Sequence, residues 1–506
     1  MLTNAAIVRF KNEYPLFFWL LLILVPLATL VPYVVLYYHA PEGTTFSGFI
    51  FASDDPDSYL ANMHLAEYGW KFKFMFTAED TTGGYIFLFY IFLGKLALLF
   101  KTSYVLMFHI ARIISGIFLI FSGWLFSKTL PLTRNERKWG FVLFCLAVQF
   151  PAWCHKYWGL VIYNPEASPF INTLLLPHVA FSQALFLLGI YFFRRWLVTE
   201  SAVTIAWGNI LIIGLVVVYP YALLPFLAVC LVSFYFHERC FPIKKALKFG
   251  FFFIASIPYL IYLLMLTKHP DIRQWQVQSA TVFSSPFEPI VFNIILTMSG
   301  IVGLFMIYRR EGLRSELLWI CAIPFLLVFL PFKFQERLLQ GAGPCLSFAG
   351  GIAINIIETR IKRVHRDLLI VGLLVATSLP LITPIFNPPE RSFLTNAEVS
   401  MYRWMQVNLT QNDVVLTDLP YSARIPGRAG CRVWCGHHDQ TFKVDEKHGK
   451  LKRFFTDKSF DRNDLLKRNN INYILWDTAN SLPPNNWLMI KKYDNLILFK
   501  CKGRTK

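Results

Sequence analysis

The sequence predicts a polytopic α-helical membrane protein that ends in a small α/β domain. Its composition, its long apolar segments and the placement of its basic residues support this fold class. The 506 residues are 55% hydrophobic and only 16% charged, whereas soluble chains are about 45–50% apolar and about 25% charged. The mean hydropathy is +0.46. These values exclude a disordered chain and disfavour an ordinary soluble protein.

Apolar segments indicate about eleven membrane crossings. The first, at 16–38, covers about 23 residues, which is long enough to cross a bilayer. No small-residue cleavage site follows it directly, so we interpret it as a retained helix. The other crossings are expected at about 104–126, 139–153, 171–193, 204–218, 220–236, 249–266, 289–308, 317–331, 344–358 and 367–386. Several have only about 15 residues, which indicates misplaced boundaries, tilt or helices broken around a cavity.

Basic residues lie mostly on one side of this predicted bundle. We treat 85–100 as an outer-surface or re-entrant segment, because counting it as a crossing would reverse every later loop. About 19 basic residues then fall in about 65 inner-loop positions, against about 9 in about 115 outer-loop positions. The positive-inside rule therefore places the N-terminus in the cytoplasm and the C-terminus outside. We expect a multi-pass protein of the cell (inner or plasma) membrane, whose net charge of +18 does not imply a nucleic-acid partner.

The chain changes character at Pro388-Pro389. Residues 1–389 form the expected transmembrane domain, and 390–506 form an expected extracytoplasmic α/β domain. Within this tail, 398–407 has helical spacing, 413–417 and 472–476 have strand patterns, and 487–500 has the pattern of a closing hairpin. The nine cysteines of the chain show neither a disulfide framework nor a strong zinc spacing.

An acidic motif lies in the first outer loop, 39–103, which is the longest loop between spans. It places Asp54, Asp55 and Asp57 within four residues. Carboxylates this close repel one another, so some should have raised pKa values unless a cation or a basic group lies among them. The simpler alternative is that Asp54 or Asp57 only caps a helix that begins after the Asp-Pro turn.

Three polar residues in or near the spans are candidates for lining a cavity at the depth of the acidic motif. Arg112 lies about a third of the way into the second span, where a charge is expensive and marks a function or a buried partner. Its alternative is snorkelling to the outer interface. Glu166 lies in the next outer loop and His178 near the outer end of the following span. Their alternatives are solvent exposure for Glu166 and core packing for His178.

The outer segment 332–337 is basic, against the sorting rule that the other loops follow. Lys333 and Arg337 are four residues apart and share a face if the segment is helical, and an arginine fork suits a phosphate. With Gln335 between them, we assign these residues to the binding of a phosphorylated lipid at the outer leaflet. The alternatives are attraction to anionic headgroups or pairing with Glu336.

This layout resembles the C-type (GT-C) integral membrane glycosyltransferases. That superfamily includes protein mannosyltransferases, aminoarabinose transferases and oligosaccharyltransferase catalytic subunits. The chain looks closest to prokaryotic members whose tail carries a short pattern of Ile-Pro, Ala-Gly, Gly-His, Lys and paired Phe. The matching positions here are Ile425-Pro426, Ala429-Gly430, Gly436-His437, Lys447 and Phe454-Phe455.

The resemblance implies roles for several of these residues. Asp54 or Asp55 matches the family's first-loop carboxylate, which activates the acceptor and in some members binds a metal, here a divalent cation such as Mg or Mn. Arg337 matches the arginine that holds the donor phosphate. This chain has Glu336 where the family pattern has a first arginine, so Lys333 and Arg337 are left to supply the charge.

The residues suit the transfer of a sugar from a polyprenyl-phosphate donor to a hydroxyl of a glycan, lipid or protein acceptor, and the resemblance implies inversion at the anomeric carbon. Such a reaction needs a carboxylate base near the acceptor and fixed positive charge where the phosphate leaves. We therefore expect the charged ends of Asp54, Asp55, Arg112 and Arg337 to converge within about 12 Å. Asp57, Glu166, His178, Lys333 and Gln335 complete the expected substrate site. The alternatives are a transporter or flippase of lipid-linked saccharides, or a noncatalytic partner of such an enzyme.

Overall fold

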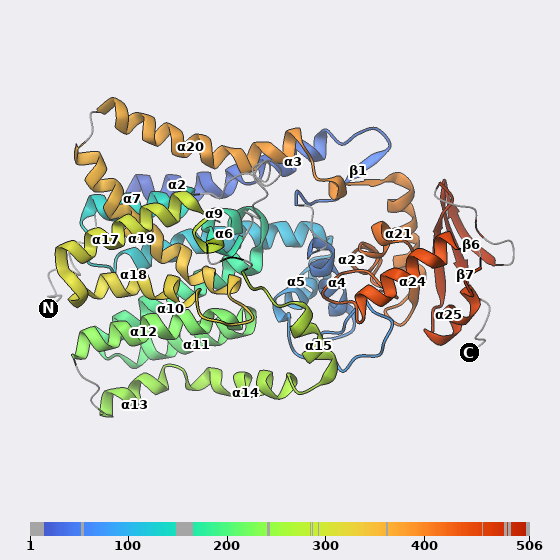
Figure 1. Ribbon diagram of the computed structural model, residues 1–506, viewed down its shortest axis with the longest axis horizontal. Helices are drawn as coiled ribbons and strands as arrows, with labels where there is room; N and C mark the ends of the chain where they lie inside the picture. The colour runs from blue at the N-terminus through green and yellow to red at the C-terminus, as the bar shows by residue number, and fades with distance from the viewer. Residues whose placement is uncertain are drawn as a thin grey trace. The chain divides into compact units, whose positions relative to one another are not determined.

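The computed structural model describes residues 15–51, 55–147, 165–239, 243–283, 285, 287–291, 293–360, 363–457, 459–479, 483 and 487–501. Asp54 lies outside them. The chain forms two compact units, which we call the helical unit and the sheet unit (Figure 1). The helical unit comprises Met1–Pro32, His109–Ile261 and Thr281–Asn387. The sheet unit comprises Tyr33–Phe108, Tyr262–Ala280 and Pro388–Lys506, so the first outer loop folds with the tail.

The helical unit is built around a central buried helix, α19 (Leu339–Arg360), which packs against α7, α17 and α18. Close approach requires small residues here: a Cβ on Gly303 of α17 would lie 1.9 Å from the carbonyl oxygen of Ala349. The helices α10, α11 and α12 form a second group side by side (Figure 1). The α-helices of this unit, of which α6 and α14 extend into residues of the sheet unit, are α2 (Pro15–Ala28), α6 (Tyr104–Ser127), α7 (Arg134–Leu146), α9 (Pro169–Leu175), α10 (Pro177–Thr199), α11 (Ala202–Val218), α12 (Leu223–Glu238), α13 (Ile243–Phe251), α14 (Ile257–Leu266), α16 (Glu288–Val291), α17 (Ile294–Glu311), α18 (Glu316–Leu327), α19 and α20 (Arg363–Phe386).

Four helices among the described residues are long and apolar enough to cross a membrane: Leu16–Tyr38, Tyr104–Ser127, Pro220–Glu238 and Lys245–Leu266. Shorter apolar helices occur at Leu88–Leu99, Ala202–Val218, Glu316–Leu327 and Ile370–Phe386. The structure thus agrees with a helical membrane protein, but the predicted eleven spans are not confirmed. One physical reason is interruption by proline: the expected span 171–193 is divided between α9 and α10 at Pro177.

The sheet unit contains a five-stranded sheet with the order β4-β3-β5-β7-β6. β3 (Val414–Leu416) pairs in parallel with β4 (Arg432–Val433) and β5 (Tyr473–Asp477). β7 (Leu496–Lys500) pairs antiparallel with β5 and with β6 (Leu488–Tyr493). The predicted α/β tail and its closing hairpin are therefore confirmed.

Each face of this sheet is covered by a different set of segments, because successive strand residues point to opposite sides. Val414 and Ile474 belong to one core cluster, which includes residues of α24 (Val444–Thr456) and α25 (Arg462–Arg468). Val415 and Leu475 belong to another, which includes residues of α21 (Asn396–Asn408), α23 (Ile425–Ala429) and the first outer loop. The loop therefore contributes to the core of the tail.

The segment 39–103, the expected first outer loop, supplies one strand and several helices to the sheet unit. β1 (Thr44–Phe46) pairs antiparallel with β2 (Phe393–Thr395) of the tail. α4 (Asp55–His64) follows the acidic motif and packs against both α5 (Leu88–Leu99) and α23. The remaining helices of the unit are α3 (Val31–Tyr38), η2 (Leu65–Glu67), α15 (Pro270–Gln278), η8 (Glu390–Ser392) and α22 (Leu419–Ser422).

The length of α5 bears on the expected outer-surface segment 85–100. The helix has 12 residues, which is about 18 Å at 1.5 Å per residue and well short of the roughly 30 Å hydrocarbon core. Its buried side chains include Tyr90, Ile91 and Leu93. Because α18, in an expected crossing, also has 12 residues, the length does not decide between the two cases, and the outer-surface position of the segment stays a prediction.

The contact between α4 and α23 depends on a glycine. A Cβ on Gly427 would lie 2.3 Å from the carbonyl oxygen of Asp57, a backbone atom that cannot rotate away. Gly427 is therefore the residue that lets the tail approach the acidic helix.

We expect Gly427→Ala to destabilise the sheet unit by about 1–3 kcal/mol, the usual cost of overpacking. Gly449→Ala is the matched control, because this glycine lies inside α24 with no atom within 4 Å of an added Cβ. That change should stabilise the helix by about 0.5–1 kcal/mol. Hydrogen exchange of sheet-unit peptides in detergent measures both effects, and equal effects would contradict the close packing at Gly427.

Candidate active site

Asp57 is bound in a buried ion pair at the first turn of α4. The Nε of Arg428, from α23, donates to Asp57 Oδ1 at 2.7 Å, and both side chains are nearly buried. Arg428 also donates to the carbonyl of Ser47 at 2.9 Å and lies over the ring of Phe49. Burial raises the pKa of Asp57, and the charges of Arg428 and Arg424 only partly oppose this.

A second buried ion pair lies beside the first. Arg424 donates to Glu398 Oε1 at 2.5 Å, and the hydroxyl of Tyr402 donates to the same oxygen at 3.2 Å. Glu398 also forms a capping box with Thr395 at the start of α21. Basic groups from α23 and its N-cap therefore do lie at the acidic motif, and burial nevertheless raises the pKa of Asp57. The tail pattern around Arg428 is visible in the sequence, but nothing in it indicates that the charge of Arg428 pairs with the acidic loop.

Asp55 differs from Asp57 in exposure and in partner. Its side chain is 49% exposed, and its Oδ1 lies 3.3 Å from Nε2 of His437, whose side chain is 9% exposed. His437 comes from the segment between β4 and α24. The predicted Gly-His element of the tail pattern therefore contacts the predicted acidic motif directly.

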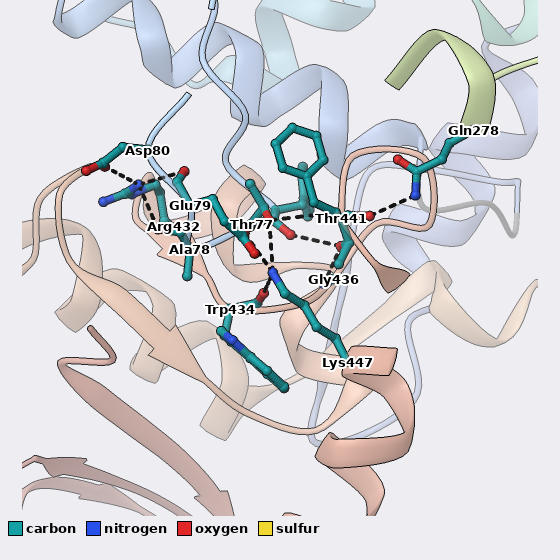
Figure 2. Close-up of polar contacts among 12 residues, drawn as sticks. Thr77, Ala78, Glu79, Asp80, Gln278, Arg432, Trp434, Gly436, Thr441 and Lys447 are labelled. Atoms are coloured by element: carbon teal, nitrogen blue, oxygen red, sulfur yellow. Dashed lines mark hydrogen bonds and ion pairs between the residues drawn. The ribbon is translucent and has the colours of Figure 1, made fainter. Parts of the chain in front are cut away.

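A polar cluster around Lys447 holds the middle of the loop 39–103, at residues 77–80, against the tail (Figure 2). The buried Lys447 Nζ donates to Glu79 Oε2 at 2.7 Å, to Thr77 Oγ1 at 3.1 Å and to the carbonyl of Trp434 at 3.1 Å. Arg432 donates to Asp80 nearby. Burial by itself raises the pKa of Glu79. The hydrogen bonds from Lys447 and Thr77 and the charge of Lys447 lower this pKa by more, so the net shift is downward.

In the helical unit, Glu166, His178 and Arg337 gather around two tyrosines. The hydroxyl of Tyr219 donates to Glu166 Oε1 at 2.7 Å, and the ring of His178 is centred 6.2 Å from that of Tyr219. The guanidinium of Arg337 lies over the ring of Tyr221, 4.8 Å from its centroid. The elements that carry these residues are η3 (Pro165–Ala167), η4 (Pro220–Ala222), η7 (Glu336–Leu338) and the start of α10. The structure thus brings together three of the predicted substrate residues.

The remaining candidates of the helical unit occupy different surroundings. Arg112 is fully buried and donates to Thr29 Oγ1 at 2.9 Å and to the carbonyls of Thr173 and Leu174. A buried guanidinium with these partners links neighbouring helices by hydrogen bonds. Snorkelling would instead require an exposed guanidinium. Its expected part in phosphate binding stays a prediction.

The segment 332–337 does not form a regular α-helix. Residues 333–335 form a turn and η7 follows, so Lys333 and Arg337 do not share an α-helical face. Lys333 is exposed, and Gln335 donates to the carbonyl of Leu330 at 2.8 Å. Because Asp54 lies outside the described residues and the other members belong to separate units, the expected 12 Å convergence stays a prediction.

The described residues do not assemble a complete metal site. Asp55 and His437 offer two potential ligands, but no group of three or more His, Cys, Asp or Glu side chains suited to a metal ion occurs in the described part of the chain. Cations of the Mg type are usually held by one or two carboxylates together with water and substrate phosphates. Asp54, the other expected ligand, lies outside the described residues, so the divalent cation stays a prediction.

Comparisons with solved structures reveal a shared architecture. The oligosaccharyltransferase of Archaeoglobus fulgidus, solved with a tethered acceptor peptide, is 12% identical, with a TM-score of 0.57 over 93% of this chain and 70% of that one. ArnT from Cupriavidus metallidurans, solved with bound undecaprenyl phosphate, is 11% identical, with a TM-score of 0.54 over 95% of this chain and 98% of that one. The chain has the GT-C glycosyltransferase fold.

A third structure with the GT-C fold, the arabinofuranosyltransferase AftD from mycobacteria, is 13% identical, with a TM-score of 0.54. The match covers 95% of this chain and 40% of AftD. No protein-family model and no curated protein matches the sequence. The GT-C likeness therefore rests on three-dimensional structure.

We expect Arg428→Met to destabilise the sheet unit by about 3–5 kcal/mol, because it leaves the carboxyl of Asp57 buried without its cation. The double variant Asp57→Asn/Arg428→Met should lose less, since it removes both charges. Arg468→Met is the control: Arg468 pairs with Asp464 at 2.6 Å but is 77% exposed, so its loss should cost at most about 1 kcal/mol. Chemical denaturation in detergent measures all three, and similar losses for Arg428→Met and Arg468→Met would contradict a structural ion pair.

The contribution of Glu79 to stability should depend on pH. Its pKa in the folded chain lies below its ordinary value of 4.5, so its stabilising effect is present above that pH and is lost as the pH falls through the folded-state pKa. Wild type should exceed Glu79→Gln in stability by up to about 1 kcal/mol near neutral pH, since Glu79 is partly exposed and screened. The difference should shrink in thermal unfolding below about pH 4. A difference that does not change with pH would contradict the charge-assisted contact.

Proposed function

We propose that this protein is a membrane glycosyltransferase that transfers a sugar from a polyprenyl-phosphate donor to a hydroxyl acceptor on the outer face of the membrane. The observation that carries the proposal is the GT-C fold over more than nine-tenths of the chain. ArnT was solved with undecaprenyl phosphate and the oligosaccharyltransferase with an acceptor peptide, which supports a lipid-linked donor and a separate acceptor. The distribution of basic residues supports an extracytoplasmic site.

Within the acidic motif we assign the catalytic base to Asp55, with Asp54 as its neighbouring alternative. A general base must reach the proton of the acceptor hydroxyl. The half-exposed carboxylate of Asp55 is accessible for that role, whereas Asp57 is buried against Arg428. Asp57 then supports the site by fixing the start of α4.

We assign the donor phosphate to Arg337, assisted by Lys333. The guanidinium of Arg337 is oriented by the ring of Tyr221, and cations so held can stabilise a leaving phosphate. Glu166 and His178 lie in the same cluster, where they would contact the sugar or its phosphate. Gln335 supports the turn that precedes Arg337.

The reaction follows from these roles. Asp55 accepts the proton of the acceptor hydroxyl, and the hydroxyl oxygen forms a bond to the anomeric carbon of the sugar. The bond between that carbon and the phosphate oxygen breaks, and its electron pair leaves on the polyprenyl phosphate. One displacement inverts the anomeric centre, and no covalent enzyme intermediate forms.

We expect Asp55→Asn to lower sugar transfer by about 10²–10⁴-fold, the usual contribution of a general base. Binding of undecaprenyl phosphate, measured by native mass spectrometry, should stay unchanged. Asp445→Asn, which removes an exposed carboxylate from α24 of the same unit, should leave both unaffected. The assay uses proteoliposomes, radiolabelled polyprenyl-phosphate monosaccharides and a membrane extract from the native cell as the source of acceptor.

Two results would overturn the proposal. Movement of labelled lipid across the bilayer by wild type without a glycosylated product would identify a transporter. Absence of both product and movement would favour a noncatalytic partner.

A further inference from the structure

His437 has a defined proton position in the sheet unit. Its Nδ1 accepts a hydrogen bond from the backbone N–H of Asp439 at 3.2 Å, so this nitrogen carries no proton. In the neutral imidazole the proton must then lie on Nε2, the atom that faces Asp55 Oδ1 at 3.3 Å. The histidine therefore donates to the carboxylate that we assign as the base.

The segment that carries His437 is held from several sides. The carbonyl of His437 accepts from the backbone N–H of Thr441 at 2.9 Å, and the N–H of Gly436 donates to Thr441 Oγ1 at 3.0 Å. That hydroxyl in turn donates to the carbonyl of Phe76 at 2.8 Å. The ring of Phe76 also packs against the imidazole, with centroids 5.5 Å apart. These contacts fix the imidazole before any substrate binds.

We propose that His437 is a positioning residue for Asp55. The proposal rests on the proposed function. The hydrogen bond from Nε2 fixes the rotation of the Asp55 carboxylate about its Cβ–Cγ bond, so that the carboxylate is aligned with the acceptor hydroxyl when the two meet. An exposed carboxylate without such a bond samples several orientations, and misplacement of a reacting group by about 1 Å can lower a rate by about 100-fold.

Two amide variants test this role while keeping side chains of similar chemistry. In His437→Gln the amide nitrogen can reach close to the position of Nε2, whereas in His437→Asn the shorter side chain can still accept from Asp439 but cannot reach Asp55. We expect His437→Asn to lower kcat by about 10–100-fold with little change in the KM for the donor. His437→Gln should recover much of the lost kcat. If His437 had only a structural role, the longer side chain of His437→Gln would recover no more kcat than the shorter one of His437→Asn.

A double-mutant cycle supplies the second readout. If His437 acts only through Asp55, then Asp55→Asn/His437→Asn should have the same kcat as Asp55→Asn alone. Hydrogen exchange of the sheet unit confirms that each variant is folded. If His437→Asn unfolds the unit, His437→Phe, which preserves the ring, replaces it in the same comparison.

The possible failures are distinguishable. An inactive wild type would overturn the proposed function, and this inference with it. An active wild type with full kcat in His437→Asn, equal losses in the Asn and Gln variants, or a loss that adds to that of Asp55→Asn would overturn the positioning role alone.

Discussion

The ion pair between Asp57 and Arg428 is the interaction on which the sheet unit depends. It joins the first turn of α4, near the start of the chain, to α23, about 370 residues later. Neither charge is tolerable alone in this environment, because a buried ion without its partner loses its hydration with no compensation. Gly427 places the two backbones close enough for the pair to form. The outer loop and the tail are therefore parts of one folded unit.

Two neighbouring carboxylates of the acidic motif have different environments, and the environments assign their roles. Asp57 is buried and held by an arginine, which suits a structural anchor. Asp55, two residues earlier, keeps half of its side chain exposed and contacts a histidine. Anchoring one carboxylate makes the position of the other predictable, since both belong to the first turn of α4. The Lys447 cluster holds the same loop at a second point, around Glu79, so the loop is fixed at two points that both precede α5.

In the helical unit, the cluster of Glu166, His178 and Arg337 is also held by neighbouring side chains, here by the tyrosines Tyr219 and Tyr221. Tyr219 and Tyr221 flank a proline-started turn, so their rings are presented to Glu166, His178 and Arg337 from a short rigid segment. Three residues that are distant in sequence thereby meet, although only His178 lies in a regular α-helix. Arg112, by contrast, is bound to carbonyl groups and is used within the helix packing.

The sequence by itself determined the class of the protein. Apolar composition and basic loops indicate a membrane protein, and the tail pattern predicted an α/β domain whose helix and strands the structure confirms. These features are local, since a period of two or a run of apolar residues is read from neighbours along the chain. The number of spans could be predicted less well, because prolines and polar residues interrupt helices at positions that an average over composition does not reveal. Only the tertiary structure decided which cation neutralises Asp57, that His437 faces Asp55, and that loop and tail share a core. Each of these is a contact between residues hundreds of positions apart, and no local periodicity encodes such a pairing.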